Sequence, residues 1–274
     1  MALALPERLL LGRVPLRLYA THSLLASLFG LDESNIRREL HHRLLPVLLG
    51  VRPVPLRDAP LRGLACEGGE GGADPPLGSG GAPPRPRRKI RTLAELFAAY
   101  PDLREVLLDA TEQSVPQPKD KHQRKLRYSG KKQDHTVKTQ IVATPRRILH
   151  AFGGLPGCLN DRLVLRASGV LWRLPKGTRV RLDKGCQGAD ASAPELAVQS
   201  PVKKPRGGGL NALERAHNHL LSVLRMPVEP HFARLKKYAA MAGVWRGRFE
   251  AHEDTFCVVA GLLNFRATGR FTLA

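Results

Sequence analysis

The sequence predicts an α/β domain preceded by a small all-helical domain. Three observations favour this fold class. Residues 5 to 50 carry helical signals, two short apolar runs typical of buried strands each end in an aspartate, and a helical stretch extends from Leu210 to Tyr238. A segment rich in Gly and Pro separates the two parts. The expected division is therefore 1–50, 51–91 and 92–274.

The N-terminal part reads as short helices joined by a glycine turn. Thr21 is a plausible N-cap, Gly30 ends the following apolar run, and Asp32 or Glu33 begins another helix that continues to about Leu45. This plan is typical of a helix-turn-helix, although an ordinary helical hairpin fits the pattern equally well. The second helix would present residue types that contact bases and phosphates: Ser34, Asn35, Arg37 and Arg38.

The charge of the chain points to a polyanionic partner. The formal net charge is +20 and the isoelectric point is about 10.6. Lys and Arg side chains release counterions from phosphates, so nucleic acid is the first candidate. A GC-rich codon bias toward Arg is the alternative source of this charge.

The four cysteines form no CxxC pair, which argues against a zinc site, and no apolar run reaches the length of a membrane span. Reduced thiols fit a cytoplasmic protein.

The segment 51–91 differs in composition from its neighbours. Between Cys66 and Arg88 it is rich in Gly and Pro and has almost no bulky apolar residues. Such a stretch buries too little apolar surface to order itself. We expect a disordered linker or an inserted loop.

From residue 92 onward the chain alternates strand and helix signals. In order, the pattern predicts a helix over 92–100, a strand over 106–108, a hairpin of 135–143 and 148–152, a strand over 178–182, and the long helix over 210–238. This order indicates an α/β domain.

Two of the predicted strands end in a carboxylate. Asp109 follows Leu107 and Leu108, and Asp183 follows Arg181 and Leu182. Aspartates at the same edge of a sheet can hold hard divalent cations, which prefer oxygen ligands. With Glu229 as a third acid, the site could support in-line displacement at phosphorus by two metal ions about 3.5–4 Å apart. Aspartates that follow strands are common in α/β proteins, so the spacing alone favours an ordinary structural role.

A series of motifs in a fixed order favours a catalytic role for these aspartates over a structural one. The motifs are Asp109-Ala110-Thr111-Glu112, Tyr128-Ser129-Gly130-Lys131-Lys132, His135-Thr136-Val137-Lys138-Thr139-Gln140, Gly157-Cys158-Leu159-Asn160-Asp161, Asp183-Lys184-Gly185, Pro201-Val202-Lys203-Lys204-Pro205 and the stretch from Arg225 to Lys236. Together they resemble the Harbinger-like DDE superfamily endonuclease domain of bacterial insertion-sequence transposases. The resemblance covers roughly residues 105 to 268, and Pro6 to Leu49 is similar to the helix-turn-helix that precedes this domain. It implies an RNase-H-like mixed sheet flanked by helices.

The resemblance also implies roles for individual residues. Asp109, Asp183 and Glu229 match the three catalytic, metal-binding acids. Asp161 resembles the aspartate of the family's Gly-Ser-x-x-Asp segment, which implies either an auxiliary metal ligand or a structural acid. Arg225, Glu229 and Lys236 follow the spacing of the family's C-terminal motif, which would place them within about 40° on one helix face. The implied cofactor is Mg²⁺ or Mn²⁺, as two ions. The implied phosphate contacts come from Lys203, Lys204, Arg225 and Lys236.

The expected function is that of a transposase. It would cleave and transfer DNA strands at the ends of an insertion sequence, with double-stranded DNA of those ends and of the target as partner. We expect a nucleoid-associated protein, and assembly as a homo-oligomer on DNA is open. Several residues depart from the family pattern, so the alternative is a truncated or decayed copy that binds DNA without catalysis. These departures are Cys186, Ser222, Pro227 and Pro230. An unrelated basic nucleic-acid-binding module is the third alternative.

Overall fold

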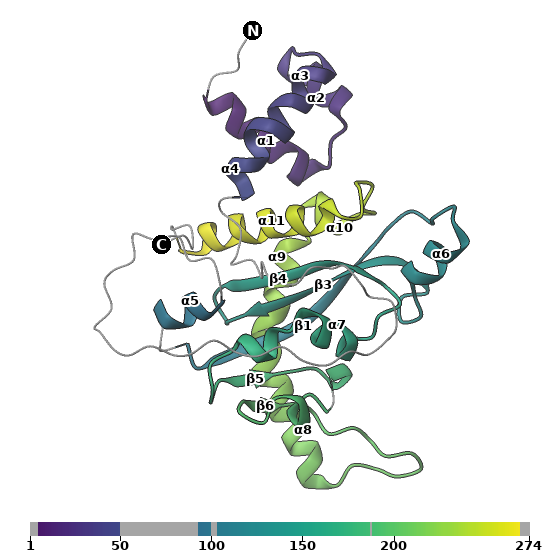
Figure 1. Cartoon of the computed structure of the whole chain (residues 1–274), viewed down its shortest axis with the longest axis vertical. Coiled ribbons are helices and arrows are strands. Elements are labelled where there is room, and N and C mark those ends of the chain that lie inside the picture. The colour runs from purple at the N-terminus through teal and green to yellow at the C-terminus, as the bar shows by residue number, and fades with distance from the viewer. Residues whose placement is uncertain (1–4, 50–92, 100–102, 187, 269–274) are drawn as a thin grey trace, which may run out of the picture.

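The computed structural model describes residues 5–49, 93–99, 103–186 and 188–268, and a mixed sheet forms its centre (Figure 1). The strands are β1 (Glu105–Ser114), β2 (Tyr128–Ser129), β3 (Asp134–Ala143), β4 (Ile148–Pro156), β5 (Arg179–Arg181) and β6 (Ala197–Gln199). The main order is β4-β3-β1-β5-β6, and β2 adds to the edge of β3. β1, β3 and β4 pair antiparallel, whereas β5 and β6 continue parallel to β1. The RNase-H-like mixed sheet that the sequence predicts is confirmed.

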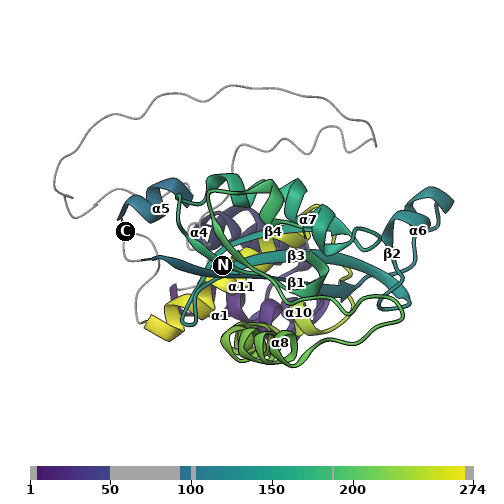
Figure 2. The ribbon, with the colours of Figure 1, turned by 90° about the horizontal axis from the view of Figure 1, so that it is seen from below.

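Helices cover both faces of this sheet. They are α5 (Leu93–Ala99), α6 (Lys121–Arg127), α7 (Asp161–Ser168), α8 (Ala212–Arg225), α9 (Glu229–Leu235), α10 (Ala239–Ala242) and α11 (Ala251–Thr268). Because side chains alternate along a strand, Leu108 and Val142 pack with α5 and α7, while Leu107 and Ile141 pack with α9, α10 and α11. Figure 2 shows α5 and α7 on one side of the sheet and α8 on the other.

The N-terminal helices have boundaries close to those that the sequence predicts. They are α1 (Leu5–Leu18), α2 (His22–Phe29), α3 (Glu33–Arg38), a π-helical turn (Glu39–Leu44) and α4 (Leu45–Leu49). The Thr21 hydroxyl accepts from Leu24 N and caps α2, and Asp32 caps α3 in the same way. Gly30 ends α2 with a φ of 62°, a left-handed conformation that glycine adopts without steric cost. Leu11, Leu25, Ile36 and Leu44 form a core of their own.

Aromatic contacts fix the N-terminal helices against the C-terminal part of the chain. The rings of Tyr19 and Trp245 stack with centroids 5.9 Å apart, and Arg246 N donates to the Tyr19 hydroxyl over 2.5 Å. The guanidinium of Arg17 lies 5.4 Å from the ring centre of Tyr238. The N-terminal helices are therefore docked onto the segment around α10 and α11, and their removal would expose Trp245.

Several elements differ from the prediction. Asp109 lies in the middle of a ten-residue strand rather than past its end, because β1 continues along β3 after β5 has stopped. The long helix over 210–238 is broken: α8 ends at Arg225, a 3-10 turn covers Met226–Val228, and α9 begins at Glu229 with Pro230 in its first turn. The segment 51–91 and Thr92 lie outside the described residues.

The sequence pattern did not indicate α11, and its composition explains why. Its apolar residues have no preferred face, since this helix packs between β4 and the N-terminal helices. Phe256, Val259 and Ala260 are buried in the core that it shares with the sheet. In the part of the chain that the structure describes, no helix combines the length and the apolar character needed to cross a membrane.

A buried histidine joins this helix to the central strand. Gln113 Nε2 donates to the carbonyl groups of Ala240 and Gly243, both over 2.8 Å. Its Oε1 therefore faces His252 as an acceptor, and the His252 Nε2–H donates to it over 2.8 Å. Nδ1 of the same ring lies 3.5 Å from the hydroxyl of Thr139. Burial lowers the pKa of His252 to about 4, so the ring is neutral at pH 7.

This histidine predicts a specific loss of stability in acid. The folded-state pKa of His252 lies below its value in the unfolded chain, so unfolding takes up a proton between about pH 6.5 and pH 4. The free energy of unfolding should fall by about 3 kcal/mol from this group as the pH decreases through that range. Urea unfolding of the parent protein and of His252→Gln measures this effect, because glutamine does not titrate in that range. The free energy of unfolding of the parent should exceed that of the variant by an amount that decreases toward pH 4. Parallel pH profiles of the two proteins would contradict it.

Candidate active site

Asp109 and Asp183 lie at the point where two parallel strands separate. β1 and β5 pair in register from Glu105–Arg179 to Leu107–Arg181, and the pairing ends there. Asp109 stands two residues farther along β1, and Asp183 stands two residues beyond β5. Both carboxylates therefore lie on adjacent strands, as the sequence predicts, just beyond the end of the β1–β5 pairing. This is the position in open α/β sheets where ligands usually bind.

A single guanidinium joins the two carboxylates. Arg225, the last residue of α8, donates from Nη1 to Asp183 Oδ1 over 2.9 Å and from Nη2 to Asp109 Oδ2 over 3.3 Å. Its side chain is 17% exposed. The resemblance implied that Arg225 grips phosphate, whereas here it binds both acids. It supplies the positive charge that keeps the two carboxylates together.

The acids of this site influence one another electrostatically. Burial raises the pKa of Asp109, and the charges of Asp183 and Asp161 raise it further. The Ala110 N–H and Arg225 act in the opposite direction and compensate for only part of this effect. Burial and the neighbouring aspartates also raise the pKa of the Cys186 thiol to about 12, so that thiol stays neutral. The site thus holds more negative charge than Arg225 neutralises.

Asp161 approaches the same acids from the start of α7. The side chain of Asn160 caps this helix by accepting from Leu163 N, which fixes the first turn. Asp161 Oδ1 accepts from Lys138 Nζ over 3.1 Å. Its Oδ2 lies against the backbone of Gly185, where the first carbon of any side chain would be only 2.8 Å away. Gly185 belongs to the 3-10 turn Lys184–Cys186 that directly follows Asp183.

Lys138 and Glu112 form a buried ion pair that the sequence pattern did not identify as part of the site. They are directly opposite each other on β3 and β1, with side chains 5% and 6% exposed and a distance of 3.3 Å between Nζ and Oε1. Lys138 Nζ also donates to Leu159 O over 2.6 Å, so all three of its protons have acceptors. Burial opposes ionisation of Glu112, but hydrogen bonds from Ser129 and Thr136 and the Lys138 charge hold its pKa below the ordinary value.

The signal for this pair was present in the sequence. Lys138 interrupts a stretch of strand-forming residues at a position where both neighbours along the strand are buried. A lysine in a buried strand requires a partner, because an unpaired charge there is strongly unfavourable. Which acid would pair with it depends on the register of β1 against β3, and the pattern did not specify that register.

Glu229 and Lys236 are exposed residues at opposite ends of α9. The break after Arg225 means that Arg225, Glu229 and Lys236 do not share one continuous helix face, in contrast to the expectation from their spacing. Glu229 occupies the first turn of α9, where a carboxylate is favoured by the helix dipole. Lys236 lies beside Thr111 and Glu112 of β1.

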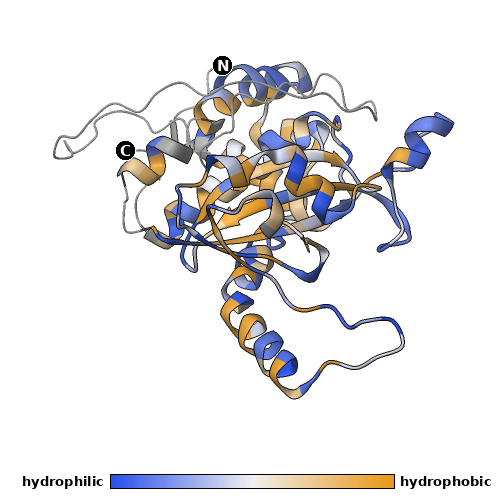
Figure 3. Cartoon of the chain, turned by 60° about the horizontal axis from the view of Figure 1, so that its bottom comes forward, coloured by the Kyte–Doolittle hydropathy of each residue, from blue (hydrophilic) through white to orange (hydrophobic). Residues whose placement is uncertain are grey.

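The predicted phosphate-binding lysines lie in an exposed loop between β6 and α8. Lys203 and Lys204 are both exposed. Asn218 of α8 holds the start of this loop, since its amide accepts from Val202 N over 2.7 Å and donates to Val202 O over 2.9 Å. Figure 3 shows that α8 and this loop project from the body of the sheet. The two lysines are thus presented to solvent on an anchored loop.

The four candidate DNA contacts of α3 have different surroundings. Ser34, Arg37 and Arg38 are exposed. The Asn35 amide donates to Asp32 over 2.5 Å, and its carbonyl accepts from Arg38 Nη1 over 3.1 Å. Arg37 lines a hollow between the N-terminal helices and α11, which Arg246 and Arg248 also line. A polyanion that reached α3 would meet arginines from both parts of the chain.

The donor set fits a hard divalent cation only in part. Asp109 and Asp183 supply carboxylate oxygens, the ligands that Mg²⁺ and Mn²⁺ prefer, and their mutual repulsion would be relieved by a cation. Within the described residues, however, no three His, Cys, Asp or Glu side chains are grouped closely enough to hold an ion. Binding would therefore require Arg225 to yield its place and a third acid, Asp161 or Glu229, to move closer.

The buried ion pair predicts a defined response to substitution. Lys138→Met leaves the Glu112 charge buried without its partner, and the free energy of unfolding should fall by about 3–5 kcal/mol. The double variant Lys138→Met/Glu112→Gln should recover at least half of that loss, because no charge remains buried. Urea unfolding at pH 7 measures both. Lys176→Met, which removes an exposed pair with Glu195, is the control and should change little. A double variant less stable than the single one would refute this account.

Comparison with known proteins identifies the family of this chain. The model of the DDE superfamily endonuclease family matches residues 108–264, a stretch that contains Asp109, Glu112, Asp161, Asp183 and Glu229. The chain is also 32% identical over 161 residues to a protein of Microchaete diplosiphon described as a probable transposase for insertion sequence element IS702. That match covers 58% of this chain and 56% of the relative, so the chain spans little more than half of the relative's length. The chain belongs to the DDE superfamily endonuclease family.

Proposed function

We propose that this protein is a transposase that cleaves DNA strands at the ends of an insertion sequence and transfers them to target DNA. The observation that carries the proposal is the pair of Asp109 and Asp183 at the separation of two parallel strands, bridged by Arg225. The family match supports a nuclease, and the relative from Microchaete diplosiphon supports transposition. In this proposal the N-terminal helices recognise the ends and residues 92–274 carry out the reaction.

The residues that would hold the metal ions are Asp109 and Asp183, with Glu229 and Asp161 as candidates for a third ligand. When bound, Mg²⁺ or Mn²⁺ ions would activate the attacking oxygen and stabilise the leaving oxygen of an in-line displacement at phosphorus. Arg225 maintains the two aspartates at close range until then. Once displaced from them, its guanidinium lies at the edge of the site and is suited to bind a phosphate.

Basic residues around the site would orient the DNA. Lys203 and Lys204 extend from the anchored loop before α8, and Lys236 lies beside β1. Such phosphate contacts fix the position of the duplex without reading its sequence. Ser34, Asn35, Arg37 and Arg38 would approach base edges from α3, in the manner of a recognition helix.

The catalytic proposal is tested by comparing two nearly isosteric variants. Asp183→Asn should abolish metal-dependent cleavage and leave DNA affinity equal or higher, because an amide is a poor ligand for a hard cation and no longer repels phosphate. Asp161→Asn should reduce cleavage by about 10-fold if Asp161 only supports the site. The measurement is cleavage of DNA carrying the element's ends in Mg²⁺ and in Mn²⁺.

The outcomes of this comparison separate the alternatives. An inactive Asp161→Asn beside an active Asp183→Asn would show that the second catalytic acid is misassigned. A parent protein that binds the ends but never cuts them in either metal would replace the proposal by DNA binding without catalysis. Unchanged circular dichroism of each variant is the control for folding.

The recognition proposal predicts different effects for two groups of basic residues. Ser34→Ala and Arg38→Ala should weaken binding to the element's ends by about 1–3 kcal/mol for each lost base contact and hardly affect unrelated duplexes. Lys203→Ala/Lys204→Ala should weaken both kinds of binding and lower the salt dependence by about one unit per lysine. Binding curves at several salt concentrations give both quantities. If the α3 variants lost the same affinity for the element's ends and for unrelated duplexes, α3 would not be a recognition helix.

A further inference from the structure

One large aromatic side chain lies outside the core near the candidate active site. Trp172 is part of the 3-10 turn Val170–Arg173 that follows α7, and its side chain is 66% exposed although Val170 and Leu171 of the same turn are buried. Trp245, the second tryptophan of the chain, is only 5% exposed. An indole left in water forfeits a large favourable burial energy, so its exposure calls for an explanation.

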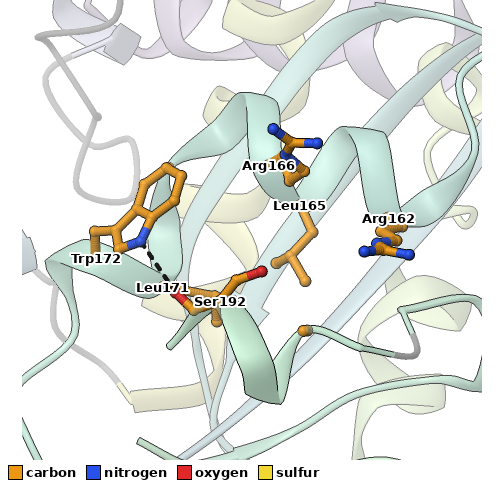
Figure 4. A pocket seen from close by; sticks show the side chains of 8 residues that line it. Arg162, Leu165, Arg166, Leu171, Trp172 and Ser192 are labelled. Carbon is orange, nitrogen blue, oxygen red and sulfur yellow. Dashed lines mark hydrogen bonds between the residues drawn. The ribbon is translucent and has the colours of Figure 1, made fainter. Parts of the chain in front are cut away.

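The Trp172 ring is held in a defined orientation. Its Nε1–H donates to Ser192 O over 3.3 Å, which anchors one edge of the indole (Figure 4). The backbone of Gly169 lies against part of the ring, since the first side-chain carbon at that position would be 3.6 Å from Cε3. The anchored edge fixes the direction of the ring, while most of its surface stays open to solvent.

The surroundings of the indole combine an apolar floor with positive charge. Leu165, Leu171 and Ala189 line the hollow beside it, and Arg162 and Arg166 of α7 line its rim (Figure 4). Both arginines are exposed. An open aromatic face beside two exposed guanidinium groups is the combination that binds unpaired nucleotides, by base stacking and phosphate contacts.

The α7 helix links this hollow to the acidic residues, because Asp161 is its first residue and Arg162, which lines the hollow, is its second. Arg162 directly follows Asp161 at the start of α7, and its guanidinium lies 3.7 Å from where a side-chain carbon at Gly188 would be, in the segment after Asp183. Arg166 lies one turn farther along the helix, and Trp172 follows the end of α7. A DNA strand that left the acids along α7 would therefore meet two cations and then the indole.

We propose that Trp172, with Arg162 and Arg166, forms a stacking site for an unpaired nucleobase of single-stranded DNA. The inference rests on the proposed function in taking DNA as the ligand, and it adds the form of DNA and the residues that hold it. Stacking on an aromatic ring is tolerant of sequence, because every base offers a π face. The site would hold a strand that has separated from its complement near the point of cleavage.

The two tryptophans make a direct test feasible. The full-length protein is titrated with an oligothymidine of about 12 nucleotides, within the site sizes of single-strand grooves, and with a duplex of the same length. Tryptophan fluorescence should be quenched by the single strand, and Trp172→Phe should lose most of that quenching because the remaining Trp245 is buried. Trp172→Leu should bind the oligothymidine about 10-fold more weakly, whereas Trp172→Phe keeps part of the affinity. Arg166→Gln should lower the salt dependence by about 0.7 unit.

Matched controls separate stacking from general loss of apolar surface. Leu213→Ala removes an exposed apolar side chain that is 80% exposed on α8 and should leave single-strand affinity unchanged. Oligothymidine affinity of Trp172→Leu within twofold of the parent would overturn the proposal, as would quenching by the duplex equal to that by the single strand. Concentration-dependent self-association that is abolished in Trp172→Leu would also overturn it, since a second copy would then cover the indole.

Failure of this inference is distinguishable from failure of the proposed function. A parent protein that cuts DNA but whose oligothymidine binding is insensitive to Trp172→Leu would overturn the stacking site alone. A parent protein that binds oligothymidine through Trp172 but never cuts would support the stacking site and remove the catalytic proposal. A parent protein that binds neither single strands nor duplexes would overturn both.

Discussion

The shared salt bridge of Arg225 is the interaction on which the arrangement of the site depends. β1 and β5 separate after Leu107, so nothing in the sheet itself holds Asp109 and Asp183 together beyond that point. Two carboxylates at close range repel each other in a partly buried setting. Burial, and to a smaller extent this repulsion, raise the pKa of Asp109. The guanidinium compensates by binding both. Because Arg225 ends α8, the same contact also determines where that helix leaves the sheet.

A second cation, the buried Lys138, supports this arrangement of charges. Lys138 connects the central hairpin to the start of α7 by binding Glu112, Asp161 and the carbonyl of Leu159. Asp161 in turn packs against Gly185, in the turn that directly follows Asp183. Two cations thus bind the acids of the site in pairs: Arg225 binds Asp109 and Asp183, and Lys138 binds Asp161 and Glu112. Such a frame preorganises charge at the site, and preorganised charge is what phosphoryl transfer requires of a protein.

Local signals were sufficient for many elements of the fold. Thr21 and Asp32 were identified as helix starts because a capping oxygen satisfies free backbone N–H groups within three residues, and Gly30 as a helix end because it adopts a left-handed conformation. The hairpin of β3 and β4 was identified from its strand-forming residues and the turn between them. In contrast, α11 has no amphipathic pattern because it is covered on several sides, and no local rule distinguishes it from other apolar segments.

For the candidate site too, the sequence pattern determined some features and tertiary packing decided the others. The sequence by itself determined the residue types that the chemistry needs, their order along the chain, and the placement of Asp109 and Asp183 near the ends of paired strand segments, because strand alternation and motif order are properties of the chain. Only the tertiary structure decided which charges meet. The partner of Lys138 depends on strand register, the partners of Arg225 depend on the break at Pro227, and the exposure of Trp172 depends on how α7 packs. Contacts between residues far apart in the chain are set by packing of the whole molecule, which no local pattern encodes.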